Sequence, residues 1–120
     1  MKYILLIYGD EREWTSLSKE EMDKVYAEHG AYGQALQAAG IEFSGYELKP
    51  VATATSVKFA KGQARTVDGP FAETKEQLAG YYVVDVPTLD DALAWARRMP
   101  GMTEGTVEVR PLAVDAGDHG

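Results

Sequence analysis

The sequence predicts an α+β fold in which an antiparallel sheet carries two helices on one of its faces. The predicted elements follow the order strand, helix, strand, hairpin, strand, helix, strand, which suits a sheet with its helices segregated to one side. Two of the strands are apolar on both alternating faces, as interior strands are, and each helix begins at a capping sequence. At 120 residues and 45% hydrophobic composition, the chain is large enough for one independent core.

The first half of the chain begins with a strand over residues 3–8, which we expect inside the sheet because both of its faces are apolar. A helix follows, since Ser18 and Glu21 form a capping box, and it ends at Gly40, where a left-handed residue is expected. A weakly alternating strand over residues 41–48 comes next. The apolar stripe of the helix is spaced by threes and fours: Met22, Val25, Tyr26, His29, Gly33 and Leu36.

The second half opens with a hairpin over residues 55–67, because Lys61-Gly62 is typical of a tight two-residue turn. Residues 79–86 form another strand that is apolar on both faces. Thr88, with an aspartate three residues later, begins the second helix, and residues 106–110 alternate strictly as a strand with one dry face does. This order is that of the ferredoxin-like arrangement.

The corner Asp68-Gly69-Pro70-Phe71 is more specific than a connection requires. An Asx-type turn explains it: Asp68 bonds to the backbone ahead, Gly69 takes a conformation that other residues avoid, and Phe71 enters the core. Alternatively, Asp68 is a carboxylate partner or ligand contact at the end of the sheet, and the two interpretations are compatible. The turn interpretation predicts that Asp68→Ala lowers stability by about 1 to 2 kcal/mol.

Composition argues against several classes of function. The chain has 12 Lys and Arg against 19 Asp and Glu, a net charge of −7 that repels nucleic acid. It has no cysteine, so thiolate chemistry is excluded, and neither a metal-ligand spacing nor a phosphate-binding glycine loop is present, so no cofactor is expected.

The location and the limits of the domain are also predicted from composition. The apolar start is too short to span a membrane and lacks a signal-peptide cleavage site, and together with the absent cysteine this indicates a cytoplasmic protein without membrane partners. Residues 115–120 are small and acidic, which predicts a flexible tail after a single domain over residues 1–114.

The candidate site residues are one histidine and several tyrosines. His29 has a side chain suited to proton transfer at the mouth of a cleft, although a histidine on an apolar stripe is often simply packed and hydrogen-bonded. The tyrosines either supply hydroxyls to a pocket or fill the layer between sheet and helices. They are Tyr26, Tyr32, Tyr81 and Tyr82.

The stretch DGPFAETKEQLAGYYVVDV, with ALQAAG before it and VEVRPL after it, resembles the DGPF branch of the YCII-related domain proteins over essentially the whole chain. The resemblance implies a ferredoxin-like fold that pairs as a dimeric α+β barrel. A His–Asp pair in a cleft led to the suggestion that YCII proteins are enzymes, and members are often encoded beside, or fused to, extracytoplasmic-function sigma factors. By this resemblance the histidine is His29, whereas Ala38 takes the place of the aspartate.

Two hypotheses follow. The first is a small homodimeric protein whose cleft between sheet and helix binds a small organic molecule. If this protein is a low-specificity enzyme, His29 is its acid or base, and Asp68 or the tyrosines assist. The second is a non-catalytic regulatory or interaction module linked to a sigma factor, in which the corner at Asp68 serves structure alone. The retained His29 favours the first and Ala38 favours the second. The homodimer is expected because two helices cover only one face of a sheet whose interior strands are apolar on both.

Overall fold

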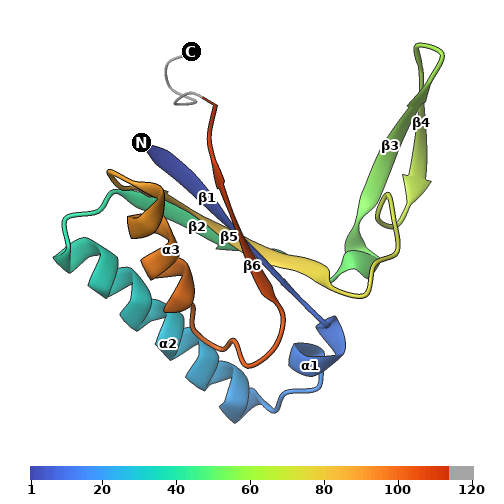
Figure 1. Ribbon diagram of the computed structural model, residues 1–120. Helices are drawn as coiled ribbons and strands as arrows, with labels where there is room; N and C mark the ends of the chain where they lie inside the picture. The colour runs from blue at the N-terminus through green and yellow to red at the C-terminus, as the bar shows by residue number, and fades with distance from the viewer. Residues whose placement is uncertain (114–120) are drawn as a thin grey trace.

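The structure is a computed structural model that describes residues 1–113, so the predicted tail at 115–120 lies outside the described residues. It contains a four-stranded antiparallel sheet in the order β2-β5-β1-β6 and a separate two-stranded hairpin, β3-β4 (Figure 1). The elements are β1 (Lys2–Gly9), α1 (Glu11–Thr15), α2 (Lys19–Ala38), β2 (Phe43–Glu47), the 3-10 turn η1 (Val51–Thr53), β3 (Thr55–Ala60), β4 (Gln63–Asp68), β5 (Gln77–Asp85), α3 (Leu89–Arg97) and β6 (Thr106–Pro111). The predicted α+β class is confirmed, and the arrangement is compatible with a ferredoxin-like fold that carries the hairpin as an addition.

The two main helices begin and end where the sequence predicts. Ser18 and Glu21 form the capping box at the start of α2, with both hydrogen bonds at 3.1 Å, and Gly40 follows the helix with a φ of 74°. The side chain of Thr88 accepts a hydrogen bond from the backbone N–H of Asp91 at the start of α3. No helix in the described part of the chain is long and apolar enough to cross a membrane.

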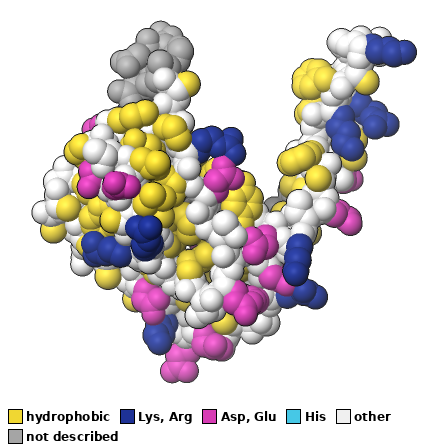
Figure 2. All heavy atoms as spheres, in the orientation of Figure 1, with side chains coloured by type: hydrophobic (Ala, Val, Ile, Leu, Met, Phe, Trp, Pro, Cys, Tyr) yellow, Lys and Arg dark blue, Asp and Glu magenta, His cyan; other side chains and the backbone are white. Residues whose placement is uncertain are grey.

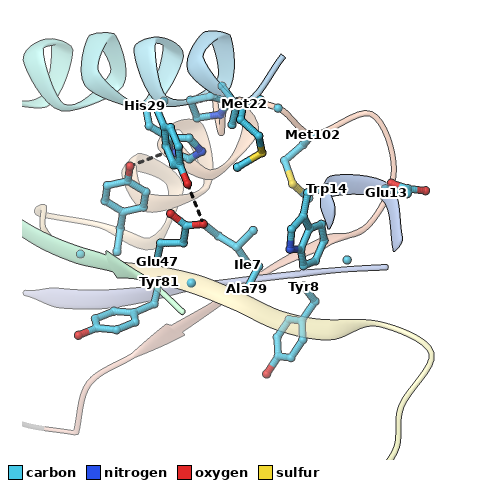
Figure 3. A pocket seen from close by; sticks show the side chains of 18 of the residues that line it. Ile7, Tyr8, Glu13, Trp14, Met22, His29, Glu47, Ala79, Tyr81 and Met102 are labelled. Carbon is cyan, nitrogen blue, oxygen red and sulfur yellow. Dashed lines mark hydrogen bonds between the residues drawn. The ribbon is translucent and has the colours of Figure 1, made fainter. Parts of the chain in front are cut away.

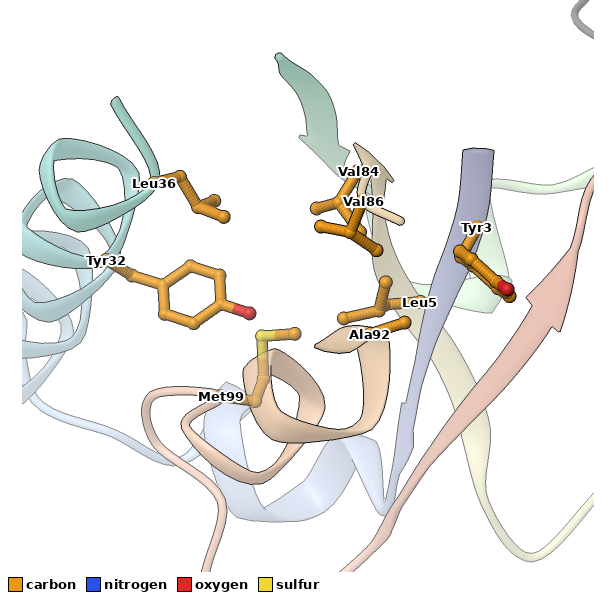
Figure 4. Packing of buried hydrophobic residues seen from close by; sticks show 8 residues of the cluster. All are labelled: Tyr3, Leu5, Tyr32, Leu36, Val84, Val86, Ala92 and Met99. Atoms are coloured by element: carbon orange, nitrogen blue, oxygen red, sulfur yellow. The ribbon is translucent and has the colours of Figure 1, made fainter. Parts of the chain in front are cut away.

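The core lies between the two main helices and one face of the sheet (Figure 4). Tyr3 and Leu5 of β1 point to this face, and they pair with Val84 and Tyr82 of β5. The buried apolar residues are Tyr3, Leu5, Tyr32, Leu36, Val84, Val86, Ala92 and Met99. Because strand side chains alternate, every second residue of β1, β2 and β5 must point to the opposite face.

That opposite face, here called the open face, carries no helix of residues 1–113 (Figure 1). The pairing registers place on it six apolar or aromatic side chains: Ile4, Leu6, Tyr8, Tyr46, Tyr81 and Val83. Tyr46 is 71% exposed, and its ring lies 6.3 Å from that of Tyr81. A charged border follows on β6, where Glu108 pairs with Arg110. The open face thus has an apolar centre and a charged edge on β6.

The hairpin β3-β4 projects from the end of the sheet as an arm and stands apart from the rest of the molecule (Figures 1 and 2). Its turn is as predicted, since Lys61 and Gly62 both have positive φ, 53° and 78°, as a tight hairpin turn requires. Phe59 is 75% exposed on it.

The corner at Asp68 differs from the prediction. Gly69 has the expected positive φ of 97°. The side chain of Asp68, however, forms no hydrogen bond within residues 1–113, so the prediction of an Asx-type turn is wrong. The corner is held instead by Ser56, whose hydroxyl donates to the Gly69 carbonyl at 2.7 Å, and by the Gly69 N–H, which donates to the Ala54 carbonyl at 2.8 Å. Phe71 is 83% exposed rather than in the core, because the arm carries this corner away from the helices.

These contacts remove the expected cost of Asp68→Ala and leave Gly69 as the position that is sensitive to substitution. Asp68→Ala should change the free energy of unfolding by less than about 0.5 kcal/mol, as surface substitutions do. Gly69→Val should lower it by about 1 to 3 kcal/mol, because a β-branched residue is strained at positive φ. Urea denaturation measures both. A loss for Asp68→Ala as large as that for Gly69→Val would mean that the carboxylate holds the turn.

Candidate functional site

A pocket of about 460 Å³ lies between α2 and the helix-bearing face of the sheet (Figure 3). Its volume is typical of sites for small organic molecules. Most of its wall is apolar: Ile7, Trp14, Leu17, Met22, Val25 and Met102. The view in Figure 3 places Trp14 and Met102 at one end and His29 at the other, with Glu47 rising from the sheet below His29. The pocket therefore has an apolar end at Trp14 and Met102 and a polar end at His29.

Two glycines make room for the pocket in its floor. A Cβ atom at Gly45 of β2 would lie 2.6 Å from the Tyr81 carbonyl oxygen, and one at Gly80 of β5 would lie 2.8 Å from the Tyr46 carbonyl oxygen. The two strands approach so closely that a larger residue fits at neither position, and the missing side chains leave space above the sheet. Sequence reasoning missed both, although a glycine inside a strand is a recognised sign of a close approach or a ligand site.

His29 and Tyr82 form the central polar pair of the pocket. The Nδ1 atom of His29 lies 2.8 Å from the hydroxyl of Tyr82, and the two rings are nearly parallel, 11° apart. Burial lowers the pKa of His29, against smaller opposing effects of the Glu47 and Glu28 carboxylates. Burial also raises the pKa of Tyr82. At neutral pH the pair is therefore an uncharged imidazole hydrogen-bonded to an uncharged phenol.

A second polar pair, Tyr26 and Glu47, lies at the rim. The Tyr26 hydroxyl donates to Oε1 of Glu47 over 3.4 Å, and the carboxylate charge raises the pKa of Tyr26. Glu47 occupies the same face of β2 as Gly45, so its side chain points towards the helix α2. Sequence reasoning missed Glu47, because a charged residue at the end of a weakly alternating strand is usually solvated.

The other predicted site residues lie elsewhere. Tyr32 is buried beside the pocket, where its hydroxyl donates to the Trp95 carbonyl at 2.7 Å and its ring meets that of Tyr82 edge-on. Burial raises the pKa of Tyr32. Tyr81 borders the pocket, but its ring turns to the open face (Figure 3). Asp68 ends β4 on the arm and does not line the pocket. The pocket thus brings together Tyr26, His29 and Tyr82.

Within residues 1–113, the His29–Tyr82 pair is joined neither by a metal-binding cluster nor by a carboxylate at the end of α2. Ala38 is the last residue of α2 and does not line the pocket. Within residues 1–113, no three His, Asp or Glu side chains gather so that they could hold a metal ion. The side chains that line the pocket can form hydrogen bonds and transfer protons.

The lowered pKa of His29 predicts how stability depends on pH. A histidine whose pKa is lower in the folded state stabilises the fold above its unfolded value of 6.5, and this contribution is lost as the pH falls through the folded pKa. We expect the wild-type protein to lose more stability than His29→Gln between about pH 7.5 and pH 5. Urea denaturation at each pH measures the difference. A constant difference between the two proteins would show that burial does not disfavour the imidazolium.

Comparison with known proteins adds two similarities. A family model described as the YCII-related domain matches residues 1–114. The chain is also 39% identical over 116 residues to "Uncharacterized protein R00369" of Rhizobium meliloti (strain 1021), an alignment that covers 95% of this chain and 94% of that protein. The family match spans the pocket, the arm and the open face together.

Proposed function

The chain belongs to the YCII-related domain family, and on this premise we propose that it is a homodimeric protein whose pocket binds a small organic molecule, on which His29 acts as an acid or base. The observation that supports this most strongly is the His29–Tyr82 pair at 2.8 Å inside a largely apolar pocket. Pockets with apolar walls and a few convergent polar groups are the usual form of small-molecule sites.

The state of the pair determines what it can do. An uncharged imidazole can accept a proton, and a hydrogen-bonding partner on one ring nitrogen leaves the other free for a ligand. Tyr82 is this partner, and Tyr32 packs edge-on against it, so the ring of Tyr82 is fixed from behind. The family's proposed route uses an aspartate that Ala38 replaces here. In this proposal Tyr82 replaces the aspartate as the group that orients His29, and Glu47 supplies a negative charge near the imidazole.

Pairing through the open face is part of the same proposal. The open face has the composition of a protein interface, because its centre is apolar and its border on β6 is charged. The apolar centre includes Ile4, Leu6, Tyr81 and Val83. A two-fold partner presenting the same face covers it, and two sheets packed in this way form a dimeric α+β barrel. Within residues 1–113, the arm stands away from this face and does not cover it (Figure 1).

A ligand screen by thermal shift tests the proposal. A ligand of the pocket raises the melting temperature of the wild-type protein, by an amount set by its concentration relative to its dissociation constant. We expect the shift to shrink in His29→Ala and in Tyr82→Phe. His119→Ala, which removes the other histidine of the chain, is the matched control and should keep the full shift. A library without any hit, or hits that ignore His29, would refute the proposal.

Catalysis is tested separately from binding. If His29 transfers a proton, then a molecule that stabilises the wild-type protein is converted by it, and His29→Gln slows the conversion far more than it weakens binding. Mass spectrometry of the incubated ligand measures the conversion. A hit that binds through His29 but remains unchanged would identify a binding protein instead.

The second candidate function is a non-catalytic interaction module linked to an extracytoplasmic-function sigma factor. The arm and the corner that follows it favour this function, because Val57 and Phe59 on the arm and Phe71 at the corner are 55%, 75% and 83% exposed. Exposed large apolar side chains often mark a surface that binds another protein. Sedimentation of the protein mixed with a purified sigma factor from the same genome tests this function. A complex that Phe59→Ser abolishes would support it, and independent sedimentation of the two proteins would refute it.

A further inference from the structure

The charges around the pocket are all of one sign. Its described lining contains no Lys or Arg, although the chain has 12 of them. It contains three glutamates, of which Glu13 turns its carboxylate outward and Glu47 turns its carboxylate towards His29 (Figure 3). The third, Glu104, belongs to the loop before β6. A molecule entering the pocket therefore meets negative charge and no compensating cation.

Glu47 is the carboxylate best placed to bind a ligand. It forms no ion pair within residues 1–113, and its one side-chain partner there is the Tyr26 hydroxyl at the long distance of 3.4 Å. A carboxylate has about four acceptor positions, so most of the capacity of Glu47 remains for a donor in the pocket. Its charge also reaches His29, on which it acts against the effect of burial.

The apolar end of the pocket suits the apolar part of a ligand whose polar group binds to Glu47. The indole of Trp14 sits directly on the backbone at Gly9, where a Cβ atom would come within 2.9 Å of the ring, so Trp14 is held in place. Met22 and Met102 are near it, and thioethers pack well against aromatic and aliphatic groups. The faces of aromatic rings such as Trp14 and Tyr26 also attract cations.

The polar end offers no positive charge to an anion. His29 and Tyr82 are both uncharged at neutral pH, so any hydrogen bonds that they donate to an anion are neutral ones. An organic acid would lose its hydration on entering and would approach Glu47, a like charge, without a cation to offset either effect.

We propose that the pocket selects an organic cation, a primary amine on an apolar or aromatic body, and rejects organic acids of the same shape. The ammonium group binds to Glu47, between Tyr26 and His29, and the body lies against Trp14 and Met22. This inference rests on the proposed function, since it assigns a class of ligand to the same pocket.

Three probes of one shape test the selectivity: phenethylamine, 2-phenylethanol and 3-phenylpropionate. Titration calorimetry of the wild-type protein should give the order amine, then alcohol, then acid. Glu47→Gln should weaken the amine by about tenfold, as loss of a charged hydrogen bond does, and leave the alcohol unchanged. Glu20→Gln, a matched loss of one charge at an exposed residue of α2 that does not line the pocket, should preserve the order.

The inference is overturned if the acid binds as tightly as the amine, if Glu47→Gln leaves the order unchanged, or if none of the three probes binds. The ligand screen above separates these failures from failure of the proposed function. Hits that depend on His29 but are acids or neutral molecules would overturn the charge selectivity alone. A screen without any hit dependent on His29 would overturn both.

Discussion

On the proposed pairing, we expect the wild-type protein to sediment as a pair at micromolar concentration and the Leu6→Glu variant to sediment as a single chain. Leu6 lies at the middle of the open face, between Tyr81 of β5 and Glu108 of β6. In a two-fold dimer the substitution buries two unpaired carboxylates, and an uncompensated buried charge costs about 3 to 5 kcal/mol. The dimer dissociation constant should therefore rise by at least about a hundredfold.

Leu89→Glu is the matched control, because Leu89 is an exposed leucine, 47% accessible, at the start of α3 and away from the open face. It should leave the dimer intact. Circular dichroism checks that both variants remain folded. A wild-type protein with the sedimentation mass of one chain would refute the dimer outright. A Leu6→Glu variant that still sediments as a pair would place the interface elsewhere.

The second large effect concerns Gly45, in the pocket floor. Gly45→Ala should lower the free energy of unfolding by about 1 to 3 kcal/mol, because its Cβ atom would overlap the Tyr81 carbonyl oxygen at 2.6 Å and the Tyr82 ring at 2.8 Å. The carbonyl belongs to the neighbouring strand, so it cannot move without disturbing the pairing of β2 with β5. Urea denaturation measures the loss.

Gly30→Ala makes the same covalent change at a position with the opposite expectation. Gly30 is exposed within α2, and a Cβ atom there would meet nothing within 4 Å. Alanine in a helix interior is favoured over glycine by about 0.5 to 1 kcal/mol, so this variant should gain stability. Equal effects of the two substitutions would show that the close approach at Gly45 is not what restricts that position.

Local signals explain which parts of the fold the sequence predicts. The capping box at Ser18, the glycine at Gly40 and the turn at Lys61-Gly62 each act within four residues, so they can be read without tertiary information. The short helix α1 could not be predicted in this way, because its five residues are too few for a periodic pattern. The exposure of Phe71 could not be predicted from local signals either. Nothing in its neighbours indicates that the arm carries it away from the core.

The site is predicted in part for a similar reason. His29 could be found from its residue type and its place on the helix stripe. Tyr81 and Tyr82 were both candidates, because their strand is apolar on both faces and alternation does not show which face meets the helices. Only the register of β5 with β1 separates them, since it pairs Tyr82 with the buried Leu5. Glu47 depends on the pairing of β2 with β5, which is equally non-local.

The central position of β1 in the sheet dictates the order in which the chain can fold during its synthesis. Its partners are β5, where Lys2 pairs with Asp85, and β6, where Tyr3 pairs with Pro111. Until those residues have left the ribosome, β1 has no strand to pair with, and of the strands only the β3-β4 hairpin can close locally. The nascent chain therefore carries an unpaired apolar strand until β5 has emerged, and such strands aggregate readily. Chains that stop before β5 should accordingly depend on chaperones to stay in solution.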